Sequence, residues 1–147
     1  MKIAVGSDER TYLTDFIIEE LKKRGIDIEL HGPLAGEPIQ WAEVAEKVAE
    51  RVADRVCDQG ILFCWTGTGV SIAANKVPGI RAALCADAET ARGARKWNDA
   101  NILAMSLRLT SPIVAKEILE GWFSESLEKE EAPNVEKVKA IEEKYSR

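Results

Sequence analysis

The chain has few of the residues that mark several common protein classes. It contains three cysteines, Cys57, Cys64 and Cys85, in no C-x-x-C pair, and a single histidine, His31. An odd number of cysteines without paired spacing favours free thiols over a disulfide framework. One histidine in a loop leaves too few ligands for a metal site, so we expect His31 to be an exposed residue without a role and the protein to hold no metal.

Positive charge and long apolar segments are also lacking. Lysine and arginine number 20 against 25 acidic residues, a net charge of −5. Nucleic-acid binding needs concentrated positive charge, and the one basic run, residues 21–24, fits the C-terminus of a helix. No segment approaches the roughly 20 apolar residues of a membrane span, and no signal peptide precedes the first predicted strand. We therefore expect no nucleic-acid or membrane partner and a cytoplasmic location.

Apolar runs alternate with amphipathic segments along the whole chain. The runs predict strands at residues 2–7, 26–30, 60–64, 80–85 and 101–105. Helical spacing predicts helices at residues 13–24, 41–56, 70–77, 87–96, 111–123 and 133–145. Such alternation predicts an α/β domain at residues 1–124, a three-layer sandwich with a five-stranded parallel sheet and helices on both faces. Residues 125–147 are charged and predict a C-terminal helical extension that docks on this subunit or on a partner.

The most informative segment is residues 60–76, in which an apolar strand brings Cys64 to a glycine-rich turn. Gly67 and Gly69 allow a tight turn and a close approach to a ligand, and the helix that follows offers free N–H groups to negative charge. The third glycine of a dinucleotide fingerprint is replaced by Ile72, and Lys76 is not placed as in a phosphate loop. This pattern leaves a general oxyanion cradle as the interpretation.

Cys64 is a candidate base for proton transfer on a carbonyl compound. It ends a predicted strand just before a helix N-terminus, a position that favours thiolate over thiol. The alternative is an inert buried thiol, which is the interpretation we favour for Cys57 and Cys85.

Other polar residues follow the predicted strands and should meet Cys64 at one edge of the sheet. Ligands bind there, beyond the carboxyl ends of parallel strands. Asp8 and Asp87 follow strands in this way, as does the segment after Met105. Asp8 and Glu9 cannot both point into one crevice, and Asp8 is the better candidate.

Taken together, these motifs resemble the ribose-5-phosphate isomerase B and galactose-6-phosphate isomerase family. The resemblance covers about residues 1–124. Its motifs are Lys2-Ile3-Ala4-Val5-Gly6-Ser7-Asp8, Gly60-Ile61-Leu62-Phe63-Cys64, Thr66-Gly67-Thr68-Gly69, Ser71-Ile72-Ala73-Ala74-Asn75-Lys76, Gly79-Ile80-Arg81-Ala82-Ala83-Leu84-Cys85, Ala91-Arg92, Asn98-Asp99-Ala100-Asn101 and Arg108.

The resemblance implies a Rossmann-like fold and cofactor-free aldose–ketose isomerisation of a sugar or sugar phosphate through an enediolate. It also implies a homodimer or tetramer with shared active sites. In such an assembly we expect the charged extension to dock on the dimer partner. Cys64 would be the base, assisted by Thr66. Asp8 and Asn98 would bind hydroxyls or assist ring opening, and Arg108 would meet the anionic end of the substrate. The enediolate oxygen would be held by the backbone of Gly67, Thr68, Gly69, Val70 and Ser71.

Three departures from the family pattern lie at the substrate end. Glu9 stands where the family has a histidine, and would repel a phosphate. Trp97 replaces the histidine expected to open a furanose ring, and the C-terminal basic motif is reduced to Lys137. The substrate is therefore expected to differ from ribose 5-phosphate, with a linear tetrose derivative or an unphosphorylated sugar as the hypotheses.

Two further tryptophans replace family residues, Trp41 a tyrosine and Trp65 a glycine. With Trp97 they either line a flatter sugar pocket or pack in the core or a dimer interface. The alternative function is a catalytically silent sugar-binding or partner subunit of a hetero-oligomeric isomerase. Retention of Cys64 favours an enzyme, because a binding protein needs no base. A thiol redox protein is a weaker alternative, since no resolving cysteine lies near Cys64.

Overall fold

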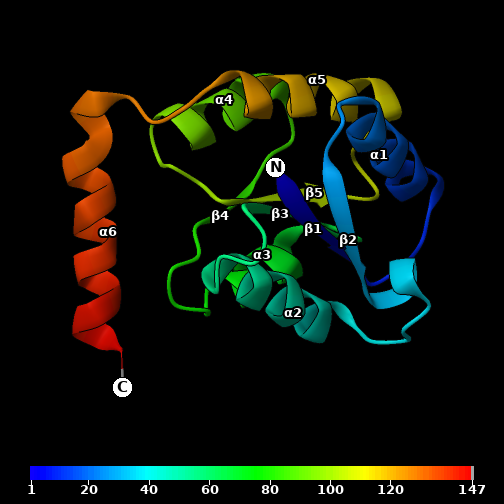
Figure 1. Ribbon diagram of the computed structural model, residues 1–147, viewed down its shortest axis with the longest axis horizontal. Helices are drawn as coiled ribbons and strands as arrows, with labels where there is room; N and C mark the ends of the chain where they lie inside the picture. The colour runs from blue at the N-terminus through cyan, green and yellow to red at the C-terminus, as the bar shows by residue number, and fades with distance from the viewer. Residues whose placement is uncertain (147) are drawn as a thin grey trace.

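Five parallel strands form the sheet at the centre of the molecule (Figure 1). The computed structural model describes residues 1–146. The strands are β1 (Lys2–Ser7), β2 (Asp27–His31), β3 (Gln59–Cys64), β4 (Ala82–Leu84) and β5 (Ile102–Ser106), in the order β2-β1-β3-β5-β4. The predicted parallel sheet is therefore confirmed.

Helices cover both faces of this sheet, as predicted (Figure 1). On one face lie α1 (Tyr12–Lys23), α4 (Ala88–Lys96) and α5 (Pro112–Ser124), and on the other α2 (Trp41–Ala53) and α3 (Thr68–Ala74). The C-terminal helix α6 (Ala132–Tyr145) stands at one side of the domain (Figure 1). Two short 3₁₀ turns, η1 (Gly32–Ala35) and η2 (Lys129–Glu131), complete the elements.

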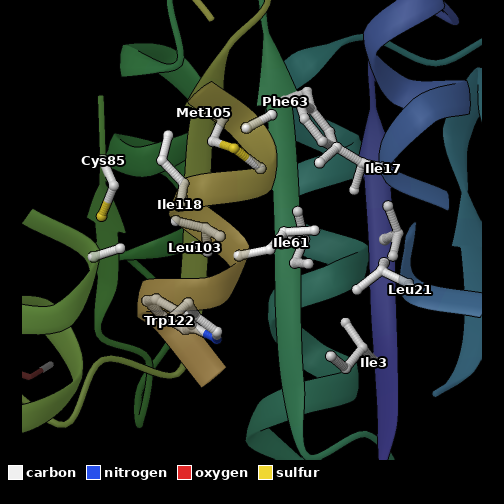
Figure 2. Packing of buried hydrophobic residues seen from close by; sticks show 14 of the residues in the cluster. Ile3, Ile17, Leu21, Ile61, Phe63, Cys85, Leu103, Met105, Ile118 and Trp122 are labelled. Carbon is white, nitrogen blue, oxygen red and sulfur yellow. The ribbon is translucent and has the colours of Figure 1, made fainter. Parts of the chain in front are cut away.

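The alternation of side chains along β3 divides the core into two clusters. Ile61 and Phe63 pack with α1, α4 and α5, as Figure 2 shows. Leu62 and Cys64 pack with α2 and α3 on the opposite face. All six residues of β3 are buried, as expected for a parallel strand covered on both sides.

The order of the strands places a crevice beyond β1 and β3. The β1–β2 connection runs through α1 on one face, whereas the connection from β2 to β3 runs through α2 on the other. Adjacent strands whose connections leave in opposite directions leave an opening at their carboxyl ends, where ligands of open α/β sheets bind. Asp8 follows β1 and Cys64 ends β3 at this point.

Three elements depart from their predicted bounds by two residues or more; the first, α3, is Thr68–Ala74 rather than residues 70–77. Helix α2 ends at Ala53 rather than at residue 56, because Arg55 adopts a left-handed φ of 60° that a helix cannot continue. Strand β4 begins at Ala82 rather than at residue 80. The side-chain oxygen of Asn75 accepts the Ala82 N–H at 2.8 Å, and its side-chain nitrogen donates to the Ala82 carbonyl at 3.0 Å. One residue earlier, the Arg81 N–H donates to the Asn101 side chain at 2.8 Å rather than to a strand carbonyl, so regular pairing with β5 begins at Ala82.

The expectation for His31 is wrong. It ends β2 instead of lying in a loop, and its Nε2 is 2.7 Å from Glu29 Oε1, with 15% of the side chain exposed. Within residues 1–146, no helix is long and apolar enough to cross a bilayer. No group of three His, Cys, Asp or Glu side chains in that part of the chain is arranged to hold a metal ion.

Candidate active site

A hollow of about 290 Å³ lies beyond the carboxyl ends of β1 and β3. Its lining consists of Asp8, Trp41, Cys64, Trp65, Thr66, Thr68 and Gly69. Asp8 after β1 and three residues of the segment that follows β3, Cys64, Thr66 and Gly69, thus line one cavity, because parallel strands end at the same edge of the sheet.

Cys64 is held in place by the neighbouring strand β5. It pairs with Ser106 in the sheet and is 5% exposed. Its carbonyl accepts the Leu107 N–H at 3.0 Å. The next carbonyl, that of Trp65, accepts the Ser106 hydroxyl at 3.0 Å and the Arg108 N–H at 3.1 Å. These bonds fix the direction in which the chain leaves β3 and bring the backbone of Arg108 beside the cavity.

The turn after Cys64 requires glycine at position 67. Gly67 has a φ of +78° and precedes α3 as its N-cap. A Cβ there would lie 2.5 Å from Leu84 Cδ1 and 3.0 Å from the Met105 carbonyl carbon. The close packing brings the first turn of α3 against the end of β5, with its N-terminal amides at the edge of the cavity.

The first amides of α3 have no carbonyl four residues earlier within the helix, so Thr68, Gly69 and Val70 offer donors to a ligand. The Ser71 N–H, by contrast, donates to the Gly67 carbonyl at 3.3 Å. The hydroxyls of Thr66 and Thr68 are 2.8 Å apart beside Cys64. Of the backbone amides predicted to form a cradle at residues 67–71, the Ser71 amide is therefore already engaged, and those of Thr68, Gly69 and Val70 have no partner within the helix.

Asp8 and Glu9 take different positions after β1. Asp8 is half-buried and lines the cavity, whereas Glu9 is exposed and is not part of its lining. The Ser7 hydroxyl donates to the Glu9 carbonyl at 2.6 Å and stabilises this turn. Burial raises the pKa of Asp8, and the nearby charge of Glu9 raises it further, against a backbone hydrogen bond that lowers it. Asp8 therefore keeps its proton to a higher pH than an ordinary aspartate.

Trp41 was not predicted to touch the glycine turn. A Cβ on Gly69 would lie 2.8 Å from Trp41 Cε3, so the indole packs against the backbone of this glycine. Trp41 begins α2 and is 43% exposed, and Trp65 is 61% exposed. Within this chain neither is a core residue; both line the cavity around Cys64. No local sequence signal links Trp41 to Gly69, which lies 28 positions away.

Trp97 and Asn98 lie in a second, larger cavity of about 660 Å³. It is enclosed between the body of the domain and α6, which contributes Asn134, Val138 and Ile141. Lys137 on α6 is exposed and is not part of this lining, and Arg108 lines neither cavity. One chain therefore does not bring Trp97, Asn98 or Lys137 into the lining of the Cys64 cavity.

Asp87, which also follows a strand, does not line the Cys64 cavity and has a structural role. It is the N-cap of α4, where its carboxylate accepts the Thr90 N–H at 2.7 Å. Cys57 and Cys85 are buried away from the site, and burial, together with the charge of Asp87, raises the pKa of Cys85 to about 12. This agrees with the expectation that these two thiols are inert.

Comparisons with known proteins agree with this geometry. A family model described as Ribose/Galactose Isomerase matches residues 3–141. Ribose-5-P isomerase B of Listeria innocua is 40% identical over 124 residues, covering 84% of each chain. D-erythrulose-4-phosphate isomerase of Pectobacterium atrosepticum is 37% identical over 142 residues, covering 94% of this chain and 93% of its own.

A solved structure gives the same result for the fold. Ribose-5-phosphate isomerase B of Clostridium thermocellum has a TM-score of 0.92 to this chain at 43% identity, covering 99% of this chain and 100% of its own. The match extends over α6 as well as over the sheet. The chain therefore belongs to the ribose/galactose isomerase family and is an aldose–ketose isomerase.

Proposed function

We propose that the protein interconverts an aldose and a ketose through an enediolate, with Cys64 as the base. The observation that carries this proposal is the position of the Cys64 thiol, in one cavity with Asp8, Thr66 and the first turn of α3. The remaining site roles implied by the family resemblance are proposed with it.

In the proposed reaction, the Cys64 thiolate removes the proton from C2 of the aldose. The electrons form the C1–C2 double bond of the enediolate, and negative charge develops on the carbonyl oxygen. Amides of residues 68–70 stabilise that charge, as preorganised donors do in an oxyanion hole. The hydroxyl proton on O2 is transferred to O1. The Cys64 thiol then returns the proton taken from C2 to C1, which gives the ketose. The reaction is balanced without an oxidant or reductant.

Asp8 and Thr66 are proposed to handle the hydroxyl protons. A carboxyl group whose pKa is raised, as that of Asp8 is, can hold a proton for a substrate oxygen more readily than an ordinary aspartate. The Thr66 and Thr68 hydroxyls are 2.8 Å apart, so one of them donates to the other. The hydroxyl that accepts this bond keeps its own proton free to donate to the substrate.

We further propose that the complete site is shared between two subunits. Asn98 and Trp97 lie in a cavity that does not include Cys64 of their own chain. A two-fold arrangement would let this cavity of one chain face the Cys64 cavity of the other. Exposed apolar side chains around the carboxyl edge, Trp65, Ile72, Leu109 and Ile113, would then be covered by the partner.

For the substrate we propose a four-carbon sugar phosphate. A tetrose 4-phosphate has no free hydroxyl that can close a furanose ring, so it needs no group to open one. This suits a site in which Trp97 stands at the ring-opening position of the family pattern. The similar Pectobacterium protein is named for a four-carbon substrate, D-erythrulose 4-phosphate.

The experiment is an NMR assay in deuterated water. Purified protein is incubated with D-erythrulose 4-phosphate, D-ribose 5-phosphate and the corresponding unphosphorylated sugars, and isomer formation and deuterium uptake at C1 or C2 are followed. Cys64→Ala should lower turnover by about 10²-fold or more, the usual contribution of a catalytic base. Cys57→Ala is the matched control, since it removes a buried thiol that lines no part of the Cys64 cavity.

The outcomes separate the alternatives. Turnover of the tetrose phosphate that Cys64→Ala abolishes supports both mechanism and substrate. Turnover of ribose 5-phosphate alone contradicts the substrate class but keeps the mechanism. No exchange with any sugar contradicts the proposal and favours a silent partner subunit. An unchanged rate in Cys64→Ala removes this thiol from the mechanism.

A second experiment tests the shared site. Chains carrying Cys64→Ala and chains carrying Asn98→Ala are co-expressed in equal amounts. If sites are shared, each mixed dimer has one site with both residues intact, and about a quarter of the wild-type sites are restored. Without sharing, the mixture stays as inactive as its two components.

A further inference from the structure

Both walls of the larger cavity are hydrogen-bonded to the same short turn, residues 79–81. One wall is helix α6, and the other is the loop that contains Trp97, Asn98 and Asp99. The turn joins α3 to β4 and lies at the base of the cavity, to which Ile80 and Arg81 contribute.

Helix α6 reaches the turn through one carboxylate. The two oxygens of Glu142 each accept the Gly79 N–H, at 3.1 Å. Within the described part of α6, Val135 is the one buried residue, so apolar contacts hold the far half of the helix only weakly. The Glu142–Gly79 bond is therefore a specific polar contact between this half of α6 and the turn, beside the half-exposed Val138 and Ile141.

The loop reaches the turn through Arg81. Its Nε donates to the Asp99 carbonyl at 2.8 Å, and its Nη2 donates to the Asp99 carboxylate at 3.3 Å. Arg95 pairs with the other carboxylate oxygen at 3.8 Å and donates to the Ala100 carbonyl. Asp99 has a φ of +49°, a conformation that non-glycine residues keep only when their surroundings hold them in it. The two arginines supply that restraint, and Trp97 and Asn98 directly precede it.

Asn101 joins the two attachments. Its side-chain oxygen accepts the Arg81 N–H at 2.8 Å, and its side-chain nitrogen donates to the Gly79 carbonyl at 2.9 Å. One amide group therefore fixes both ends of the turn. The result is an unbroken series of hydrogen bonds from Glu142 through Gly79, Asn101 and Arg81 to Asp99.

We propose that Arg81 and Asn101 are positioning residues for substrate binding, because they set the spacing between α6 and the Trp97–Asn98 loop. The proposal rests on the proposed function, in which this cavity completes the site of a partner chain. Neither residue lines the Cys64 cavity, and Asn101 lines neither cavity, whereas Arg81 also contributes to the wall of the larger one. They are therefore expected to act on substrate affinity through the loop and helix, with little effect on proton transfer itself.

The test is steady-state kinetics with D-erythrulose 4-phosphate and D-ribose 5-phosphate. Asn101→Ala and Arg81→Ala should raise KM by about tenfold or more while kcat changes much less, since misplaced binding groups weaken a productive complex. Arg81→Lys keeps the charge and should recover part of the affinity. Glu142→Gln, at the surface, removes only the charge that binds α6 and should give a smaller rise in KM.

Two control variants remove ion pairs outside this network. Lys139→Ala breaks the pair with Glu136 on α6, whose atoms are 3.0 Å apart. Arg92→Ala breaks the pair with Glu89 on α4, at 2.9 Å. Both should leave KM unchanged. If they raise it as much as Asn101→Ala does, the effect is a general loss of stability and the proposal is wrong.

A double-mutant cycle separates positioning from stability. Once Asn98→Ala has removed a binding contact of the loop, holding the loop in place matters less, so Asn101→Ala should raise KM less in that background than in the wild type. Fully additive effects, or a lower melting temperature with unchanged KM, would overturn the proposal. If Asn101→Ala does not fold, the same cycle is run with Arg81→Lys.

Failure of the proposed function gives a different result. In that case Asn98→Ala alone leaves KM unchanged, because the cavity takes no part in binding. If Asn98→Ala raises KM but Asn101→Ala and Arg81→Lys do not, the cavity binds substrate and only the positioning role is refuted.

Discussion

Substituting Gly67 by alanine tests how tightly the turn after Cys64 is packed. Alanine at a φ of +78° costs about 1–2 kcal/mol on its own. The added Cβ would also lie 2.5 Å from the Leu84 methyl and 3.0 Å from the backbone of Met105. The Leu84 side chain can turn aside, but the Met105 backbone belongs to a buried strand, so overpacking adds about 1–3 kcal/mol. The total is about 2–5 kcal/mol.

The assay is thermal unfolding with a matched control. For a chain of this size, each kcal/mol lowers the melting temperature by about 2–4 °C, so Gly67→Ala should lower it by about 4–20 °C. Gly25→Ala has a similar φ of +73° but no atom within 4 Å of the new Cβ, and should show only the backbone cost. Gly67→Ala should also lose turnover, because Thr66 and Thr68 move with the turn. Equal losses of stability in the two variants would refute the steric argument.

Three further predictions concern charge and packing. Arg51 binds Glu29 with two hydrogen bonds of 2.6 and 2.8 Å and, with His31, lowers its pKa to about 2, so Glu29→Gln should cost about 1–2 kcal/mol at pH 7 after allowance for solvent screening. The ionised form is favoured by folding, so this loss should shrink as pH falls from 4.5 towards 2, which urea unfolding at several pH values can measure. Asp8→Asn should lower kcat but raise the melting temperature slightly at pH 7, since the raised pKa means that folding disfavours the charged form; below the usual pKa of 3.8 the gain should vanish in calorimetry. Trp122→Phe should cost about 2–4 kcal/mol in chemical denaturation with kcat unchanged, because it opens a cavity and leaves the buried Gln59 oxygen without its 2.9 Å partner.

Local chemistry explains why much of the fold could be predicted. Ser111 and Pro112 mark the start of α5, and the structure shows the Ser111 hydroxyl accepting the Val114 N–H at 3.2 Å. The buried strand β3 is equally clear from its continuous apolar run. The end of α2 could not be predicted in this way, because its apolar spacing continues to Val56 while the backbone turns at Arg55.

The candidate site, too, could be predicted from the sequence only in part. That Asp8 and Cys64 would meet follows from the topology of a parallel sheet. The family pattern identifies the glycine turn that follows Cys64. The contact of Trp41 with Gly69 and the bond of Glu142 to Gly79 join residues far apart in the chain, so no local pattern contains them. The distribution of Trp97 and Cys64 between two cavities depends on where α6 lies, which composition alone leaves open.

The burial of β3 on both faces has a consequence for how the molecule opens. Its backbone pairs with β1 on one side and β5 on the other, so its amides should exchange hydrogen only when the whole domain unfolds. Helix α6, with one buried residue in its described length, should exchange through local openings of far lower free energy. The thiol would thus sit on a slowly exchanging strand, and the wall proposed to bind substrate would sit on a helix that opens locally. Substrate could then enter and leave while the geometry for proton transfer stays fixed.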